Sequence, residues 1–229
     1  MRSLILTIGR HKAYPFVCFI LVIGAFLYTE PFKALNLRYA ISFFGAITGL
    51  ICVILFTRRS QLGNYFGLLA TFGESMGNFL GGNIGAGLPH LYNFSTHVYG
   101  IFNWRKHHDQ EDKVITRSLT WLQMFYVISA FFAIFGLSIW ITKVMGVDNT
   151  LGQLIVNGII FGLAVPAQTL LVMRYDFNWY LWIIMNVFVV GLNFFGPEPN
   201  PVIGAQYCIY LFNAVYGLIE WRSFAHKKQ

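Results

Sequence analysis

The sequence predicts an all-α membrane protein with eight transmembrane helices. Of its 229 residues, 56% are hydrophobic and only 11% are charged, whereas a soluble domain usually carries about 25% charged residues. The mean hydropathy is +0.58. A chain with so little charge cannot cover a water-facing surface, so we expect the lipid bilayer to be its solvent.

Eight apolar segments of roughly membrane-spanning length follow one another along the chain. They run over residues 14–29, 39–57, 62–82, 88–104, 119–143, 151–173, 178–195 and 201–221. The first is short, but it follows Arg10 and Lys12 and precedes seven more. We therefore predict a retained helix there and not a cleaved signal peptide.

The positions of the basic residues predict the topology. With eight spans both termini lie on one side, and all Lys and Arg residues fall on that side except Lys33, Arg38 and Lys143. Because Lys and Arg gather in cytoplasmic segments, both termini are expected in the cytoplasm. The net charge of +7 then reports topology, and no nucleic-acid partner is expected.

An internal repeat organises the chain. Val98-Tyr99-Gly100 followed by Trp104 reappears as Val215-Tyr216-Gly217 followed by Trp221, an offset of 117 residues, and Arg59 and Tyr65 match Arg174 and Tyr180 at an offset of 115. One helix separates the copies, so they have the same orientation, as in one class of transporters. We predict an N-terminal helix and loop (1–38), a three-helix repeat (39–105), a cytoplasmic loop and linker helix (106–150), and a second repeat with a cytoplasmic tail (151–229).

Polar residues within the spans predict a solute pathway between the repeats, because polar groups that face lipid are costly. Trp182 and Asn186 lie four residues apart on one helix face, where a Trp ring and an amide can stack on and orient a planar solute. His90, Asn93 and His97 form a second stripe. Each residue singly also fits an ordinary interhelical hydrogen bond. The expected substrate-binding residues are Trp182, Asn186, Gln168, Tyr207, His90, Asn93, His97 and Asn213.

We expect no enzymatic activity from this chain. It has no GxxxxGK[ST] motif for ATP, no HExxH and no GxSxG, so we predict no catalytic residues, no metal and no cofactor. The spans hold no deep Lys or Arg, which favours a neutral or cationic solute over a phosphorylated one. Glu74 is the one carboxylate placed well inside a span; proton coupling and a structural hydrogen bond are both open to it.

Several motifs resemble the PnuC-type family of vitamin transporters. Asn178-Trp179 with Trp182 and Asn186 is similar to the family signature NW-x-x-W-x-x-x-N, and Asn64-Tyr65-Phe66-Gly67-Leu68 resembles its NYFFGL stretch. The similarity covers most of residues 40–222. His90 and His97 depart from it, since family members often carry a Gln and an Asn in that helix.

The resemblance implies a SWEET-like fold of three plus one plus three helices with an added N-terminal helix. It implies facilitated diffusion of nicotinamide riboside across a bacterial cytoplasmic membrane, trapping by a cytoplasmic kinase on the way to NAD, and a homotrimer. The alternatives are a relative that carries thiamine or riboflavin, proton-coupled transport through Glu74, and, remotely, a haem-binding electron carrier that uses His90 and His97.

Overall fold

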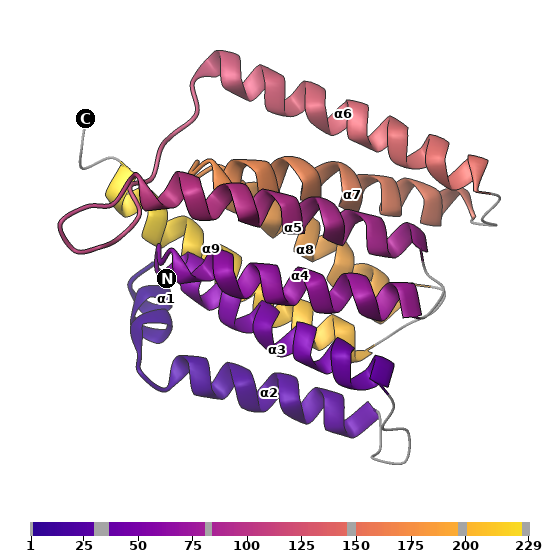
Figure 1. Cartoon of the computed structure of the whole chain (residues 1–229), viewed down its shortest axis with the longest axis horizontal. Helices are drawn as coiled ribbons and strands as arrows, with labels where there is room; N and C mark the ends of the chain where they lie inside the picture. The colour runs from indigo at the N-terminus through magenta and orange to yellow at the C-terminus, as the bar shows by residue number, and fades with distance from the viewer. Residues whose placement is uncertain (1, 30–36, 81–83, 146–149, 197–200, 226–229) are drawn as a thin grey trace.

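The computed structural model describes residues 2–29, 37–80, 84–145, 150–196 and 201–225, and within these ranges it is helical, with no strand. Its helices are α1 (Arg2–Arg10), α2 (Tyr14–Thr29), α3 (Leu37–Thr57), α4 (Leu62–Leu80), α5 (Ile84–Arg105), α6 (Trp121–Val144), α7 (Leu151–Val172), α8 (Asn178–Phe195) and α9 (Pro201–Ala225). The long helices run side by side along the molecule (Figure 1).

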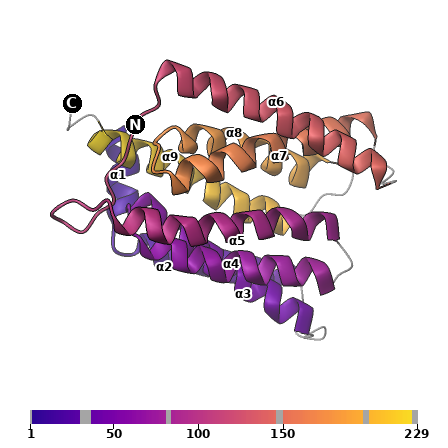
Figure 2. The ribbon, with the colours of Figure 1, turned by 45° about the horizontal axis from the view of Figure 1, so that its top comes forward.

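Two groups of three helices form the centre of the molecule. In one, α4 packs between α3 and α5; in the other, α8 packs between α7 and α9. The groups meet where α3 contacts α9 and where α5 contacts α7. Helix α2 covers α9 and α3 on the outside, and α6 lies against α7 at the opposite edge (Figures 1 and 2).

The eight predicted segments all contain helices, with boundaries within a few residues of those expected. Helix α1 was not predicted; it is bent by 80° from the start of α2. Within the described residues, and judged by length and hydropathy alone, α6, α7 and α8 are suited to cross a membrane, and the bent pair α1–α2 adds a fourth if it counts as one span. The all-helical prediction is confirmed, while the count of eight spans stays a prediction.

Local sequence explains where helices begin and how closely they approach. Helices α6 and α7 both start with a capping box, in which Thr120 pairs with Gln123 and Thr150 with Gln153, and this satisfies backbone N–H groups of the first turn. Small residues allow close packing. A Cβ atom on Gly73 of α4 would lie 3.1 Å from the Cα atom of Gly45 in α3.

Helices α3 and α7 end in the same way. Arg59 and Arg174 both have positive φ, at 57° and 70°, and the backbone N–H of each donates to the carbonyl three residues earlier. A non-glycine residue in this conformation is uncommon and needs support from its surroundings. Both side chains are buried and donate to loop carbonyls, Arg59 to Val114 and Arg174 to Ile115.

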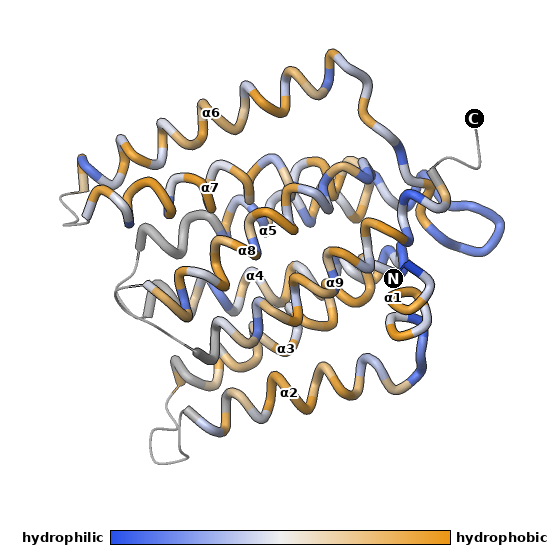
Figure 3. The backbone as a smooth tube through the Cα atoms, turned by 180° about the vertical axis from the view of Figure 1, so that it is seen from behind, coloured by the Kyte–Doolittle hydropathy of each residue, from blue (hydrophilic) through white to orange (hydrophobic). Residues whose placement is uncertain are grey.

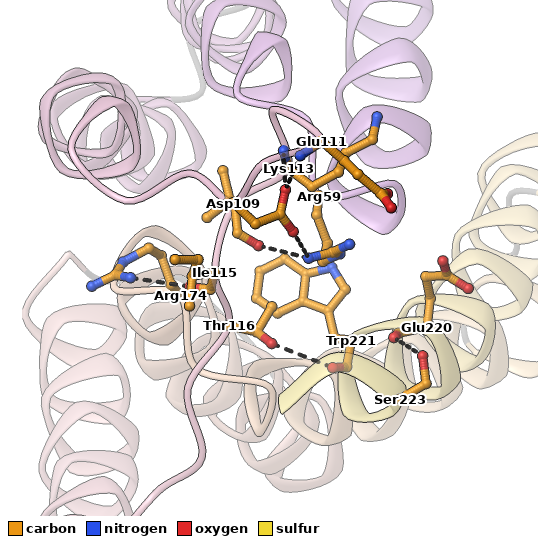
Figure 4. Close-up of polar contacts among 11 residues, drawn as sticks. Arg59, Asp109, Glu111, Lys113, Ile115, Thr116, Arg174, Glu220, Trp221 and Ser223 are labelled. Carbon is orange, nitrogen blue, oxygen red and sulfur yellow. Dashed lines mark hydrogen bonds and ion pairs between the residues drawn. The ribbon is translucent and has the colours of Figure 1, made fainter. Parts of the chain in front are cut away.

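These bonds belong to the α5–α6 loop (residues 106–120), which ties together the ends of three helices. The N–H of Val114 donates to the carbonyl of Arg59, and the N–H of Arg117 donates to that of Arg174. The Thr116 hydroxyl donates to the carbonyl of Trp221 (Figure 4). The loop is strongly hydrophilic and lies at the end of the bundle where α1 begins and α9 finishes (Figure 3). We call this end the basic end, because it carries Arg10, Lys12, Arg58, Arg59 and Lys113.

Two tryptophans join the three-helix groups across the basic end. The indole N–H of Trp104 on α5 donates to the carbonyl of Val172 on α7 at 2.9 Å, and that of Trp221 on α9 donates to the carbonyl of Phe56 on α3 at 2.8 Å. Both indoles are fully buried. Each therefore satisfies a helix-terminal carbonyl that belongs to the opposite group.

Replacing Trp221 with Phe is expected to destabilise the protein by about 0.5–1.5 kcal/mol, because the indole bond to the carbonyl of Phe56 is lost while the backbone N–H of Arg59 still donates to that carbonyl. Thermal unfolding in detergent measures the change. Trp121→Phe is the control, since Trp121 is 85% exposed and should alter the unfolding temperature little. Equal losses in the two variants would contradict the assignment.

Candidate functional site: a polar cavity between the helix groups

A cavity of about 940 Å³ lies between the two three-helix groups. Residues of α3, α4 and α5 form one wall and residues of α7, α8 and α9 the other, while Ser138, Ile141, Thr142 and Met145 of the α6 region complete its lining. Binding sites for small molecules usually enclose about 300–1,000 Å³. The cavity is therefore large enough for a nucleoside or a vitamin.

Seven of the eight expected substrate-binding residues line this cavity, and Asn213 does not. The seven are Trp182, Asn186, Gln168, Tyr207, His90, Asn93 and His97. Asn213 is fully buried elsewhere and donates to the carbonyl of Ile209. Six residues separate it from Tyr207, which is about 240° around a helix, so placing both in one cavity was wrong for Asn213.

Three amide side chains in the cavity have no hydrogen-bond partner among the described residues. They belong to Asn186 on α8, which is 3% exposed, to Asn93 on α5 and to Asn157 on α7. Trp182 lies one helical turn before Asn186 and packs against the neighbouring apolar clusters. A buried amide that the protein leaves unpaired can donate to and accept from a solute.

Gln168 and His97 play a different part, because they bond mainly to each other. The side-chain amide of Gln168 on α7 lies 3.2 Å from the Nε2 atom of His97 and donates to the Thr96 hydroxyl. His97 lies 3.4 Å from Asn64 and stacks on Phe56. This network connects α7 to α5 and α4 at the cavity wall, so it fixes the wall as well as lining it.

Glu74 also lines the cavity, where its carboxylate lies 2.9 Å from the Nδ1 atom of His90. Both side chains are about one-third exposed. Among the Asp, Glu, Lys and Arg residues of the chain, Glu74 is the one in the described lining of the cavity. The cavity therefore combines aromatic faces, amides and one carboxylate, an arrangement suited to a cation.

Sequence reasoning also missed members of the site. Tyr210 lines the cavity, and the repeat contained the signal for it, because Tyr207 and Tyr210 occupy the positions of His90 and Asn93 in the second copy. Trp179 is a further member: it is 3% exposed, lines the cavity and lies edge-on to Trp221.

The chain is similar in sequence to known transporters. The chain is 28% identical over 198 residues to the nicotinamide riboside transporter PnuC of Neisseria mucosa, covering 77% of this chain and 69% of that protein. It is 27% identical over 191 residues to the protein of the same name from Haemophilus influenzae, covering 76% of each.

The fold also matches a solved structure. The crystal structure of the vitamin B3 transporter PnuC superposes with a TM-score of 0.72 at 21% identity, covering 96% of this chain and 94% of that one. The relatives are transporters and not enzymes, as the sequence led us to expect. Since the model of the nicotinamide mononucleotide transporter family matches residues 39–223, this multi-pass membrane protein belongs to that family.

Proposed function

We propose that this protein takes up nicotinamide riboside by facilitated diffusion through the cavity between its helix groups, and that phosphorylation in the cytoplasm traps the solute. One observation carries the proposal: a cavity of about 940 Å³ with the Trp182–Asn186 pair on one wall and Glu74 on the other. The relatives named as nicotinamide riboside transporters support the choice of substrate.

Charge separates the riboside from the mononucleotide after which the family is named. Nicotinamide riboside carries a cationic pyridinium ring, whereas the mononucleotide adds a phosphate. Burying a phosphate without a cationic partner is expensive, and no described residue of the cavity lining is Lys or Arg. The aromatic faces and Glu74 suit the riboside.

Each part of the riboside has a chemically matched group in the cavity. The pyridinium ring suits the face of Trp182, where cation–π attraction is worth about 2 kcal/mol when the cation is desolvated. The carboxamide and ribose hydroxyls suit the amides of Asn186 and Asn93, which have no partner in the described structure. Tyr207 adds a further aromatic wall with a hydroxyl.

The architecture that we propose is an N-terminal helix followed by two parallel SWEET-like repeats joined by α6, with eight spans in all. The paired helix ends at Arg59 and Arg174 and the reciprocal bonds of Trp104 and Trp221 support the repeat. The basic end faces the cytoplasm in this proposal, with both termini there, in a bacterial cytoplasmic membrane. A homotrimer is proposed from the family resemblance.

Ligand binding to the detergent-purified protein tests the substrate. Calorimetric titration with nicotinamide riboside, nicotinamide mononucleotide, thiamine and riboflavin should give saturable binding of the riboside alone. Binding of thiamine or riboflavin instead would assign the protein to another vitamin. Tight binding of the mononucleotide would overturn the charge argument. A Soret band in the purified protein would support the alternative of a haem-binding electron carrier.

Proton coupling through Glu74 is the second candidate, because this carboxylate lines the cavity and contacts His90. If the protein is a uniporter, Glu74→Gln in proteoliposomes should weaken riboside binding but leave uptake independent of a proton gradient. Coupled transport predicts that the variant loses accumulation driven by the gradient while it keeps exchange. The wild type treated with a proton ionophore is the matched control.

A further inference from the structure

A second hollow, separate from the central cavity, lies at the basic end. It has a volume of about 390 Å³ and shares none of its described lining residues with the cavity. Segments far apart in the sequence meet there: α1 and the turn after it, the end of α3, the α5–α6 loop and the last turns of α9. The lining residues are Arg10, Lys12, Arg58, Arg59, Glu111, Lys113, Tyr216, Glu220 and Phe224.

The charge of this hollow is only partly balanced within the protein. Arg10 pairs with Glu220 at 2.8 Å, and Arg59 pairs with Asp109 at 3.1 Å. The side chains of Lys12, Arg58 and Lys113 have neither an ion pair nor a hydrogen bond among the described residues, and Glu111 is the remaining acidic group of the lining. Three cations thus converge on one concave surface with one acid beside them.

The surroundings of the hollow suit a position at the level of lipid headgroups. Helix α1 turns through 80° from the start of α2, and its Leu4 and Ile8 are exposed at 62% and 41%. The outward side of α2 is apolar as well, with Phe16 67% exposed. A short helix with exposed apolar residues and terminal Arg residues, bent away from a membrane-embedded helix, fits the interface between lipid tails and headgroups.

We propose that this hollow binds the phosphate group of an anionic phospholipid headgroup. Lys12, Arg58 and Lys113 supply the charge-assisted hydrogen bonds, and the acyl chains lie along the exposed apolar residues of α1 and α2. Isolated Lys and Arg at a membrane surface act as diffuse attraction. Here the cations line a concave site, so the position of the lipid is fixed and not averaged over the surface.

A charge-matched pair of double variants tests the site. Lys12→Gln with Arg58→Gln removes two cations from the hollow, while Arg105→Gln with Lys106→Gln removes two exposed cations from the same end without touching it. Thermal unfolding of each detergent-purified protein is titrated with phosphatidylglycerol, phosphatidylcholine and inorganic phosphate. The unfolding transition of each variant without added lipid reports separately whether it is folded.

Phosphatidylglycerol should stabilise the wild type more than phosphatidylcholine does. Its apparent affinity should fall about 25-fold in the hollow variant, since each Lys or Arg near an anionic surface contributes about a factor of five, and it should hold in the control variant. Equal falls in both variants, or no fall in either, would overturn the site. Stabilisation by inorganic phosphate without any by phosphatidylglycerol would overturn the assignment to lipid.

Discussion

Replacing Trp182 with Ala should weaken nicotinamide riboside binding about 30-fold. Trp182 lines the cavity one helical turn from Asn186, and its indole face is the surface on which the pyridinium ring is proposed to lie. Loss of a desolvated cation–π contact costs about 2 kcal/mol, and each 1.4 kcal/mol is a factor of ten in affinity. Calorimetric titration of the purified variant measures the change directly.

Trp140→Ala is the matched control, because Trp140 on α6 is 62% exposed on the outside of the molecule. It changes the same atoms without touching the cavity, so riboside affinity should stay as in the wild type. Trp182→Phe should recover part of the affinity, since Phe keeps a smaller aromatic face. Unchanged affinity in Trp182→Ala would remove the ring from the proposed site, whatever Trp182→Phe does.

The helices and their order could be predicted because the hydrophobic segments are long and basic residues lie between them. Helix α1 was not predicted because its nine residues are too few to span a membrane and carry an Arg at each end. The low hydropathy of α5 has a structural reason: its polar residues His90, Asn93 and His97 line the cavity. A hydropathy criterion therefore undercounts helices that face a polar cavity.

The candidate site could be predicted only as far as helix faces could be derived from spacing. Spacings of three and four place Asn93 with both His90 and His97 and place Trp182 with Asn186, and the structure brings all five to one cavity. Spacing within a helix does not say which neighbour a face contacts. Asn213 was misplaced for another reason, because its spacing of six from Tyr207 already puts it on a different face of α9.

Pairwise contacts across the site could not be predicted from the sequence, for a different reason. The 2.9 Å contact of Glu74 with His90 joins two helices, and the bond of Gln168 to His97 joins the two helix groups. Such contacts depend on the rotation and depth of each helix in the bundle. Local pattern determines neither quantity, since both follow from the packing of all the helices together.

Replacing Arg59 with Gln is expected to destabilise the protein by about 2–3 kcal/mol. The Arg59 side chain is 4% exposed, donates to Asp109 and to the carbonyl of Val114, and lies 3.7 Å from the ring centroid of Phe224. Removing one partner of a buried ion pair costs about 3–5 kcal/mol. The lower figure applies because the Asp109 side chain is 21% exposed and water can partly replace the Arg.

Comparison with Arg10→Gln tests whether the burial of an ion pair or its N–O distance determines its contribution to stability. The Arg10–Glu220 pair is shorter, at 2.8 Å against 3.1 Å, but the Arg10 side chain is 55% exposed. Solvent screening limits an exposed pair to about 0–1 kcal/mol, so thermal unfolding in detergent should rank Arg59→Gln well below Arg10→Gln. The reverse order would mean that the α5–α6 loop does not depend on Arg59.

The same pair predicts how stability depends on pH. Burial opposes ionisation of Asp109, but hydrogen bonds from the N–H groups of Lys113 and Glu111 and from Arg59 outweigh it and lower its pKa below the usual 3.8. A carboxylate with a lowered folded-state pKa stabilises the protein fully above its unfolded pKa and loses that contribution as pH falls through the folded value.

The free energy of unfolding of the wild type should therefore decline between pH 5 and 3. The decline should be smaller in Arg59→Gln, because the variant has already lost part of the interaction. An identical decline in both proteins would mean that other carboxylates carry the acid sensitivity and that Arg59 stabilises the loop through Val114 and Phe224 alone.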